Sequence, residues 1–295
     1  PTALMVIKTI VLTTDAENGN WLIVSGPSVE SYLGKRIIWE QTNLSGTVVD
    51  CATTLIDQNI INPSINARKI PSIVLGESIE DTHIIKKQIT GDNLLTAITE
   101  LLNTYKLGFS MDFNDSLVSK SLSFRVYKGT NRSSAQSINP KVIFSPYFDN
   151  LLATTIQASN ANYRNVAKVA GEGEGVNRTT YVVGVASGVD REEIYVDAKD
   201  ISSQTEGGTL TPSEYNDILA QRGDEALAEC VATQDFEGEI EPMTNFVYGV
   251  DYFLGDVVDL QNEYGISAIV RITEITESWD ENGYKCIPTF NSKEV

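Results

Sequence analysis

The most regular alternation of apolar and polar residues lies near the C-terminus. Between residues 266 and 272 apolar side chains recur at every second position, with Ile269 as the exception. A period of two predicts a strand that buries one face. The pattern slips after Ile272, because the next apolar residue is Ile275. We therefore predict a bulge that bends this strand at Thr273 and Glu274.

The segments around this strand predict a β-meander. Residues 280–283 end in Asn-Gly, which is a strong signal for a tight hairpin turn, and 284–290 form the return strand. Before the long strand, Gly255 and Asp256 separate two short apolar segments, 252–254 and 257–260, which are also predicted as strands. None of these segments carries an evident chemical motif.

The N-terminal pattern predicts a hairpin followed by shorter elements. Residues 4–12 are apolar and β-rich, and 21–24 form the returning strand after a turn cluster. Ser28 can begin a short helix, and 36–39 have the pattern of a further short strand.

The next segment changes to an α+β pattern. Thr47 can cap a helix that runs to about residue 58, and Asp92 can cap a second helix that ends at Gly108. Around these helices the pattern predicts strands at 83–89, 109–113 and 122–127, the last two forming a hairpin around Asn114 and Asp115.

The second half is predicted to be mainly β with one long helix. Thr211, Pro212 and Glu214 form a capping box with proline at the first helical position, and apolar residues then recur at helical spacing over 212–233. Strands are predicted at 142–144, 151–158, 163–170, 179–185, 194–196 and 236–240.

These elements predict three domains in one α+β, mainly β chain. The first β domain is 1–45, the α+β insertion is 46–135, and the second β domain is 136–295 with helix 212–233. The first domain is short, and the chain opens at Pro1 without an initiator methionine. We therefore expect that upstream strands belong to a longer protein, or that the first domain is completed in another way.

Composition excludes some partners. The 295 residues are 41% hydrophobic, which is enough for two domain cores. The net charge of −18 disfavours specific nucleic-acid binding, which depends on Lys and Arg, and contact with an anionic membrane. No apolar run approaches the roughly 20 residues of a membrane span, so no membrane insertion is expected. Cys51, Cys230 and Cys286 share no metal-binding spacing and are expected to be buried free thiols.

Few residues offer catalytic chemistry. His83 is the only histidine, which excludes histidine-dependent triads and two-histidine zinc sites within this chain, and an ordinary surface or edge histidine is expected. The segment 171–175 has alternating glycines like a phosphate loop, but it lacks the following Lys-Ser/Thr and carries Glu172 and Glu174. We expect a flexible hairpin tip there, with a loop at a subunit contact as the alternative.

Carboxylate and aromatic clusters leave two alternatives open. Asp112 with its neighbours and residues 280–282 lack calcium-loop spacing, and the acidic residues around Arg191 are expected to form an exposed charge cluster. A glycosidase pair assembled in space is not excluded by spacing. The aromatic residues of 144–150 fit either a sugar or protein contact or a joint packed into the core. We expect no catalytic, cofactor-binding or metal-binding residues, no cofactor and no enzymatic activity.

A series of short segments, taken in order, carries a resemblance to a known family. The segments are 25–26, 33–39, 68–71, 124–133, 142–145, 150–152, 163–167, 169–173, 190–192, 196–198 and 251–258. Their order resembles the ReqiPepy-type hub family of siphophage and prophage tail proteins, which is similar to the baseplate hub of contractile phage tails.

The resemblance implies a structural protein of the virion tail, assembled in the bacterial host cytoplasm. It implies a homotrimeric ring with two β-barrel-like domains per subunit, an α+β insertion and contacts to the tube or distal tail protein and the tip protein. Such a ring would join the tail tube to the tip, and DNA would pass without specific binding. An acidic passage would repel DNA phosphates. The alternatives are a tail-associated cell-wall hydrolase and a host-surface binding module.

Overall fold

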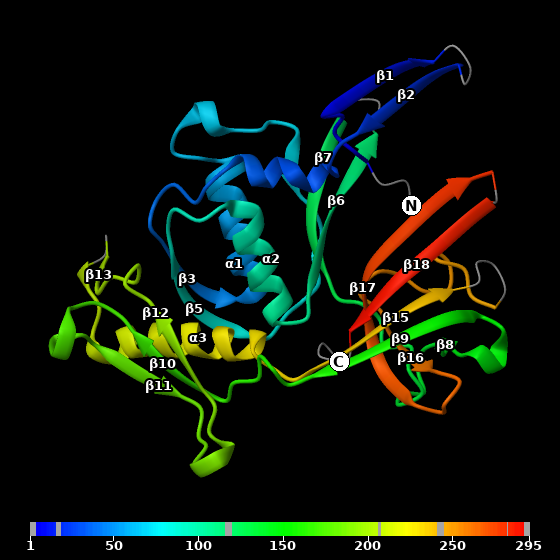
Figure 1. The fold of residues 1–295 in the computed structure, drawn as a ribbon. Helices are drawn as coiled ribbons and strands as arrows, with labels where there is room; N and C mark the ends of the chain where they lie inside the picture. The colour runs from blue at the N-terminus through cyan, green and yellow to red at the C-terminus, as the bar shows by residue number, and fades with distance from the viewer. Residues whose placement is uncertain are drawn as a thin grey trace. The chain divides into compact units, whose positions relative to one another are not determined.

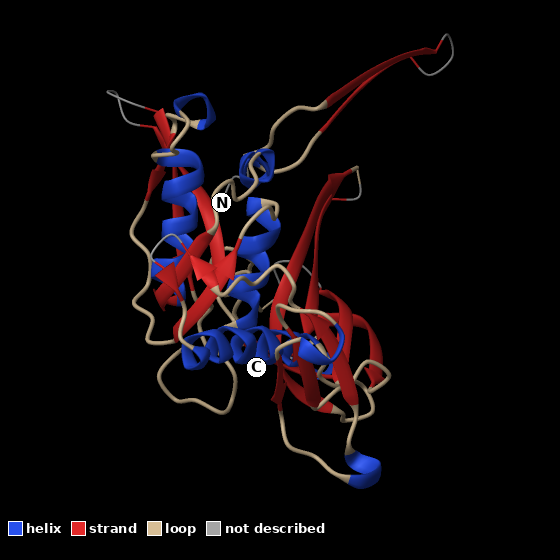
Figure 2. Cartoon of the chain, turned by 90° about the vertical axis from the view of Figure 1, so that its left-hand side faces the viewer, coloured by secondary structure: helices blue, strands red, loops and turns tan. Residues whose placement is uncertain are grey.

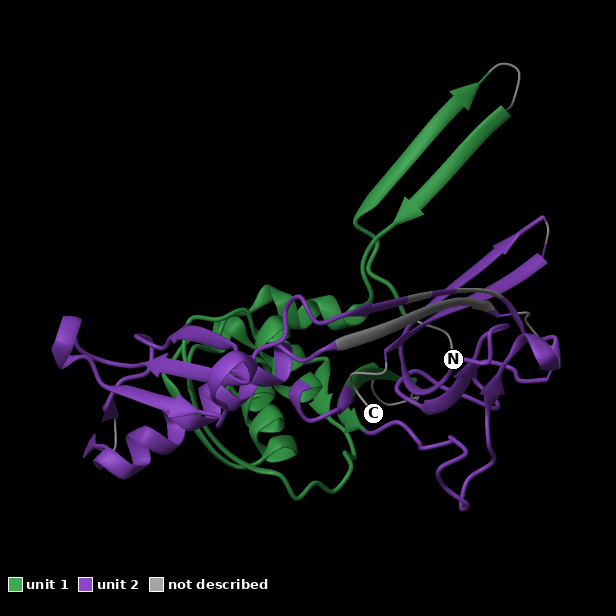
Figure 3. Ribbon diagram, turned by 60° about the horizontal axis from the view of Figure 1, so that its bottom comes forward, with its two compact units in different colours: residues 1–103, 109–127 green, residues 104–108, 128–295 purple. Residues whose placement is uncertain are grey.

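The computed structural model describes residues 4–15, 19–115, 120–205, 208–240, 245–281 and 283–291. The fold is α+β and mainly β, as expected. The chain divides into two compact units, shown in Figure 3: unit 1 comprises 1–103 with 109–127, and unit 2 comprises 104–108 with 128–295. The three-domain division at 45/46 and 135/136 stays a prediction.

Unit 1 begins with the predicted hairpin. Strands β1 (Thr9–Asp15) and β2 (Gly19–Ser25) pair antiparallel from Thr9 opposite Ser25 to Asp15 opposite Gly19. A 3₁₀ segment, η1 (Val29–Lys35), follows, but the Ser28 side chain makes no capping hydrogen bond. The strand expected at 36–39 is wrong: this segment contributes only one bridge, from Ile37 to Asn93.

Two helices form the centre of unit 1 (Figure 1). The Thr47 side chain caps α1 (Val48–Ile56) by accepting from the Asp50 amide at 3.0 Å, and the π-helical segment η2 (Asp57–Ile61) continues it. The second helix, α2 (Leu94–Thr104), is capped by Asn93 and not by Asp92. The Asn93 side chain accepts from the amides of residues 95 and 96.

The end of α2 also differs from the prediction. Lys106, with a φ of 60°, takes the left-handed position expected of glycine, and Gly108 instead opens a strand. Buried apolar residues of the helices, the nearby strands and the segments between them contribute to the core of unit 1: Leu33, Ile38, Leu55, Ile56, Ile60, Ile73, Ile85, Leu94, Ile98 and Phe124.

Two small sheets complete unit 1. One pairs β3 (Thr42–Thr47) with β5 (Ile84–Ile89) in antiparallel fashion. The other has the order β4-β7-β6, from β4 (Ile73–Leu75), β7 (Lys120–Tyr127) and β6 (Gly108–Asp115). Asn114 and Asp115, expected in a turn, therefore lie within a strand. Residues 116–119, which connect β6 and β7 in the sequence, lie outside the described residues.

The larger sheet of unit 2 has six strands in the order β8-β16-β17-β18-β15-β9. The C-terminal meander is confirmed, because β17 pairs antiparallel with both β16 and β18. Residues 252–254 form a turn with one bridge at Tyr252, so the strand expected there is wrong. The strands are β8 (Ile143–Phe144), β9 (Leu151–Ser159), β15 (Thr233–Ile240), β16 (Val257–Gln261), β17 (Ser267–Asp280) and β18 (Gly283–Asn291).

The bulge in the long strand is confirmed. The register of β17 against β18 shifts between Ile272 and Glu274, where the alternation slips in the sequence. The two outer strands, β8 and β9, do not pair with each other, so the described strands form an open sheet and not a closed barrel. Aromatic rings fill the core beneath it, with Phe144 5.2 Å from Tyr252 and 5.7 Å from Phe290 between ring centroids.

The rest of unit 2 is a small three-stranded sheet with one helix. Strand β10 (Val166–Ala170) lies between β11 (Thr180–Val183), its antiparallel neighbour, and β12 (Glu193–Asp197), its parallel neighbour. Helix α3 (Pro212–Glu229) has the predicted capping box and packs against β10. It ends before residue 233, because Thr233 already begins β15.

Short elements connect these parts. They are the 3₁₀ turns η3 (Asn66–Arg68), η4 (Pro146–Phe148), η5 (Gly175–Asn177) and η6 (Gly188–Asp190), and the two-residue strands β13 (Gln204–Thr205) and β14 (Gly208–Thr209). No helix of the described residues is both long enough and apolar enough to cross a membrane.

Candidate functional site

The most unusual surface of unit 1 is the hairpin of β1 and β2, which we call the N-terminal ribbon. Figure 1 and Figure 2 show it extending away from the rest of unit 1, with no helix or further strand of that unit laid along it. An isolated two-stranded hairpin in water is marginally stable at best. The ribbon is therefore an element that needs additional contacts.

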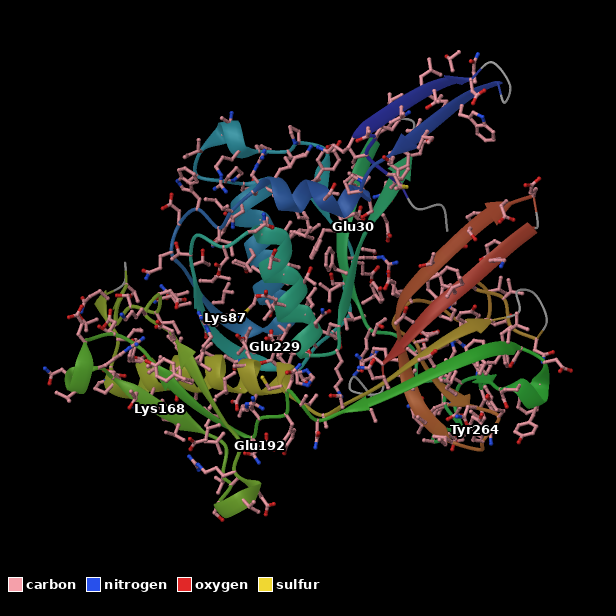
Figure 4. The ribbon with its side chains drawn as sticks, in the orientation of Figure 1. Glu30, Lys87, Lys168, Glu192, Glu229 and Tyr264 are labelled. Carbon is pink, nitrogen blue, oxygen red and sulfur yellow. The ribbon has the colours of Figure 1, made fainter. Side chains whose placement is uncertain are left out.

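Both faces of the N-terminal ribbon are apolar. Leu12 lies opposite Leu22 on one face, and Val11 lies opposite Ile23 on the other, because side chains alternate along a strand. Figure 4 shows side chains projecting from both strands of the ribbon. The exposed fractions are 64% for Ile10, 43% for Val11, 69% for Leu12, 64% for Leu22, 57% for Ile23 and 47% for Val24.

The ribbon is also nearly free of charge. Its two strands contain one charged residue, Asp15, in a chain whose net charge is −18. At its base a groove of about 520 Å³ continues the apolar surface, lined by residues that include Met5, Ile7 and Phe113. Contiguous apolar surface of this kind marks an interaction site in soluble proteins.

The sequence pattern predicts this hairpin but not its exposure. The sequence does show that the hairpin differs from a half-buried one. Apolar residues run consecutively at 10–12 and 22–24, without the alternating polar residues of a half-buried strand. Consecutive apolar residues indicate a strand that is covered on both faces, and unit 1 provides no such cover.

The glycine-rich loop at 171–178 is tied down by residues from distant parts of unit 2. The Tyr215 hydroxyl accepts from the Glu172 amide at 2.7 Å and donates to the Ile201 carbonyl at 3.0 Å. Arg178 donates to the carbonyls of Ala170 and Gly171 at 2.6 and 2.8 Å. These contacts occupy groups that a bound phosphate would use.

Glu172 contributes a further tether to this loop. Its carboxylate accepts from the Ser203 amide at 2.9 Å. Hydrogen bonding from Ser203 holds the pKa of Glu172 below its ordinary value of 4.5, although partial burial acts in the opposite direction. An ionised carboxylate in this position disfavours an anionic ligand. A subunit contact at this loop stays a prediction.

His83 lies at the surface, with its side chain 53% exposed and Nδ1 2.6 Å from the Asp81 carboxylate. Burial acts to raise the pKa of Asp81, but hydrogen bonds from His83 and Thr82 outweigh it and lower the pKa. Asp81 also accepts from the Val48 amide at 3.2 Å, at the first turn of α1. The pair therefore supports a helix N-terminus.

Several of the carboxylates considered for catalysis are engaged in ion pairs. Asp112 pairs with Arg125 in a cavity of about 680 Å³ whose lining also includes Glu77. The acidic cluster around Arg191 behaves as expected, because Arg191 pairs with Glu193 at 2.5 Å on the surface. A glycosidase acid must be able to protonate a leaving group, and a carboxylate paired with a permanently charged guanidinium is poorly suited to this role.

One carboxyl group with a raised pKa was missed by sequence reasoning. Burial raises the pKa of Asp224, and the neighbouring Glu225 adds to the effect. Both residues are in α3, where adjacent positions point in different directions. The sequence offers no signal for this shift beyond the acidic pair itself, and the geometry does not direct the two carboxyls at one reacting bond.

A buried ion pair in unit 2 was also missed. The Arg132 Nε lies 2.7 Å from the Asp256 carboxylate, and the two side chains are only 15% and 3% exposed. Asp256 also accepts from the amides of Thr130 and Phe253, at 2.6 and 3.0 Å. Gly129 lies against the Gly255 carbonyl so closely that an added Cβ would be 1.7 Å from its oxygen. This network holds the start of unit 2 in place.

The aromatic segment 144–150 contains both buried and exposed rings. Phe144 is fully buried in the core, whereas Tyr147 and Phe148 are 67% and 51% exposed.

Cys51 and Cys286 are buried as expected, but Cys230, at the end of α3, is only partly buried. Among the described residues, no group of three or more His, Cys, Asp and Glu side chains could hold a metal ion.

Known structures share this fold. A tail protein from Neisseria meningitidis MC58 aligns with a TM-score of 0.57 and 15% identity, over 98% of this chain and 80% of that chain. The 43 kDa tail protein of prophage MuSo2 from Shewanella oneidensis aligns with a TM-score of 0.54 and 13% identity, over 98% and 79%. Prophage tail protein gp18 from Listeria monocytogenes EGD-e gives 0.51 and 14%, over 98% and 77%.

The family assignment comes from the sequence. No curated protein matches the chain. The profile of the family described as Siphovirus ReqiPepy6 Gp37-like protein matches residues 3–290, which is nearly the whole chain. The chain therefore belongs to the siphovirus ReqiPepy6 Gp37-like family.

Proposed function

We propose that the protein is a non-enzymatic hub of the tail tip, in which three copies form a ring that joins the tail tube to the tip. The observation that carries the proposal is the N-terminal ribbon, which presents apolar side chains on both faces without cover from its own unit. A structural protein of the tail meets its partners through surfaces of this kind, and burial of about 800 Å² per partner is typical of a stable contact.

A ring requires two different surfaces on each copy. When one surface of a copy meets a different surface of the next, the contacts close into a ring if the rotation between copies divides a full turn. The ribbon supplies one such surface. Neighbouring tail proteins, such as the tube or distal tail protein and the tip protein, would cover the two ends of the ring.

The net charge of −18 gives the ring a second property. An acidic passage repels DNA phosphates, so DNA can move through without being held. This part of the proposal predicts that the purified protein shows no measurable retention of double-stranded DNA at low salt, where electrostatic binding is strongest. Retention that weakens steeply with added salt would contradict it.

The mass of the protein in solution tests the ring directly. Light scattering over a concentration series should approach three times the chain mass of 32.3 kDa. The Leu12→Lys variant should shift the series towards the monomer, because a charge would be buried in an apolar contact. Ile138→Lys is the matched control, since Ile138 is 90% exposed outside the ribbon. A chain that stays monomeric at every concentration, also in mixtures with its neighbouring tail proteins, would overturn the proposal.

Two other functions have distinct readouts. A carboxylate-dependent cell-wall hydrolase would clear a bacterial cell-wall substrate in a zymogram at high protein load. A host-surface module would use exposed aromatic residues such as Tyr147 and Phe148, and the isolated chain would then bind host cells. The hub proposal predicts that the chain does not clear the cell-wall substrate. It also predicts that the chain binds other tail proteins and does not bind host cells.

A further inference from the structure

The sheet edges of this chain are not equally protected against pairing with another chain. Exposed edges invite intermolecular pairing, and natural proteins block them with very short strands, charged residues, proline or bulges. Most outer strands here have one of these features. β4 and β8 have three and two residues, β5 carries Lys86 and Lys87, β6 carries Asp112 and Asp115, and β12 carries Glu193 and Asp197.

Among the outer strands of seven or more residues, two carry neither charge nor proline, and the register shift of β9 against β15 is confined to the first residues of β9. β2 has seven residues (GNWLIVS) and β9 has nine (LLATTIQAS), and neither contains a charged residue or proline. β2 pairs only with β1, and β9 closes one end of the six-stranded order, so no described strand lies on the other side of either. The shorter outer strands β3 and β11 are also uncharged, but only β2 and β9 offer an uncharged edge of seven or more residues, which favours these two as sites of pairing with another chain.

We propose that β2 of one copy pairs with the outer edge of β9 in a second copy, so that the N-terminal ribbon extends the six-stranded sheet of its neighbour. This inference rests on the proposed ring and names the strands that form its contact. The contact is an example of β-strand addition, in which backbone hydrogen bonds supply affinity and alternate side chains supply specificity.

Length and charge favour a second copy as the occupant. At about 3.4 Å per residue, β2 spans roughly 24 Å and β9 roughly 30 Å, so one edge can cover the other. Copies with a net charge of −18 repel each other, and contact through two uncharged strands keeps like charges away from the centre of the interface. The pairing joins two different surfaces, as a closed ring requires.

The pairing also explains the apolar side chains of the ribbon. Strand addition gives hydrogen-bond partners to the backbone groups along the outer edge of β2. The face that carries Leu12 and Leu22 then becomes continuous with a face of the neighbouring sheet. The same geometry would bring the groove at the base of the ribbon, with Met5 and Ile7, close to the neighbour. These residues then add apolar burial to the backbone contact.

Cysteine cross-linking between two differently tagged chains tests the pairing. One chain carries Ile23→Cys in β2, and the other carries either Thr155→Cys or Gln157→Cys in β9, both in a Cys230→Ser background that removes the partly exposed thiol. Mixing and mild oxidation should give a heterodimer band under non-reducing conditions, at least tenfold stronger than with Val189→Cys as the partner. Val189 is 94% exposed and lies outside both strands.

Charge substitution gives an independent readout. Gln157→Lys in β9 and Ile23→Lys in β2 should each raise the concentration needed for assembly at least tenfold, because Lys blocks edge pairing. Circular dichroism and thermal unfolding of the monomers should remain close to the parent protein. Val185→Lys is the matched control at a fully exposed position, and it should assemble normally.

The outcomes separate this inference from the proposed function. A three-copy ring that forms without the cross-link, and that tolerates both Lys substitutions, would overturn the pairing and leave the hub proposal intact. If a single chain that carries both cysteines cross-links within itself while the two differently tagged chains do not cross-link, the inference would also be overturned, because β2 and β9 would then be paired in the same copy. A chain that never assembles, alone or with tail proteins, would overturn both.

Discussion

Asp256 combines more contacts than any local pattern around it suggests. Its carboxylate is 3% exposed, pairs with Arg132, and accepts from two backbone amides. The sequence places Asp256 in a turn, which is correct, but the partner lies 124 positions away. No spacing rule connects residues this far apart, so the ion pair could not be predicted.

Asp256→Asn is expected to destabilise the protein strongly. Removing one charge of a buried pair leaves Arg132 without its counter-charge, and losses of about 3–5 kcal/mol are typical. Urea unfolding followed by circular dichroism measures the change in the free energy of unfolding. Asp115→Asn is the control, because Asp115 is 67% exposed and 3.9 Å from Lys120. Equal effects of the two substitutions would contradict the account of this network.

Glu172 predicts a pH dependence with a defined sign. Its pKa in the folded protein is below the ordinary value of 4.5, so the ionised form stabilises the fold. That stabilisation is fully present above pH 4.5 and is lost as the pH falls through the folded pKa. The difference in unfolding free energy between the parent protein and Glu172→Gln should shrink over that range. A difference that grows on acidification would contradict the tether to Ser203.

The three thiols should differ in reactivity. Burial, with a smaller contribution from Asp50, raises the pKa of Cys51 to about 11, and burial also raises the pKa of Cys286. The thiolate is the reactive form, so both should react slowly with iodoacetamide in the folded protein. Cys230 should be alkylated first, as measured by mass spectrometry of peptides. Early labelling of Cys51 at pH 7 would show that α1 is less well packed than described.

Helix starts were among the most predictable elements. Thr47 and the box from Thr211 to Glu214 cap their helices as expected. The start of α2 was displaced by one residue, because Asp92 and Asn93 are both suitable caps and only the structure shows which side chain reaches the free amides. A cap involves residues only a few positions apart, so the sequence predicts its position to within about one residue.

The capping box of α3 gives a prediction at this scale. Thr211→Ala removes the acceptor for the Glu214 amide and should cost about 1 kcal/mol of unfolding free energy. Ser28→Ala is the matched control, because Ser28 precedes a helical segment without a capping hydrogen bond from its side chain. Thermal unfolding of both variants measures the difference. A larger loss for Ser28→Ala would contradict this reading of the two caps.

The long pattern near the C-terminus predicted its strand well, whereas short patterns were correct at 142–144 and 194–196 and wrong at two other places. The slip after Ile272 correctly located the bulge in β17, because a change of face leaves a clear trace in the order of residues. Residues 36–39 and 252–254 have similar composition but form no strand. Three or four apolar residues fit a turn packed on the core equally well, and tertiary contacts decide between the two.

At the scale of the whole molecule, the fold class followed from the sequence and the contact surface did not. The order of α and β segments indicates an α+β chain, but the exposure of the N-terminal ribbon depends on which elements lie beside it in space. Closure of a barrel likewise depends on pairing between β8 and β9, and the described strands leave that sheet open. Both features depend on which segments lie beside a strand in space. The pattern of residues within that strand does not specify those neighbours.

In the proposed assembly, copies meet through uncharged strand edges. This arrangement would explain why a strongly acidic protein keeps β2 and β9 free of charge and why the ribbon carries apolar residues on both faces. In the proposed hub, function depends on the geometry of the sheets and on contact between subunits.

Electron microscopy of the purified protein tests this claim most directly. Particles should be imaged at a concentration where light scattering shows the full assembled mass, with Leu12→Lys as the comparison. End-on class averages are expected to show a ring with threefold symmetry and an open centre, and Leu12→Lys should give single chains. Compact particles without threefold symmetry, or rings that Leu12→Lys leaves unchanged, would contradict the account.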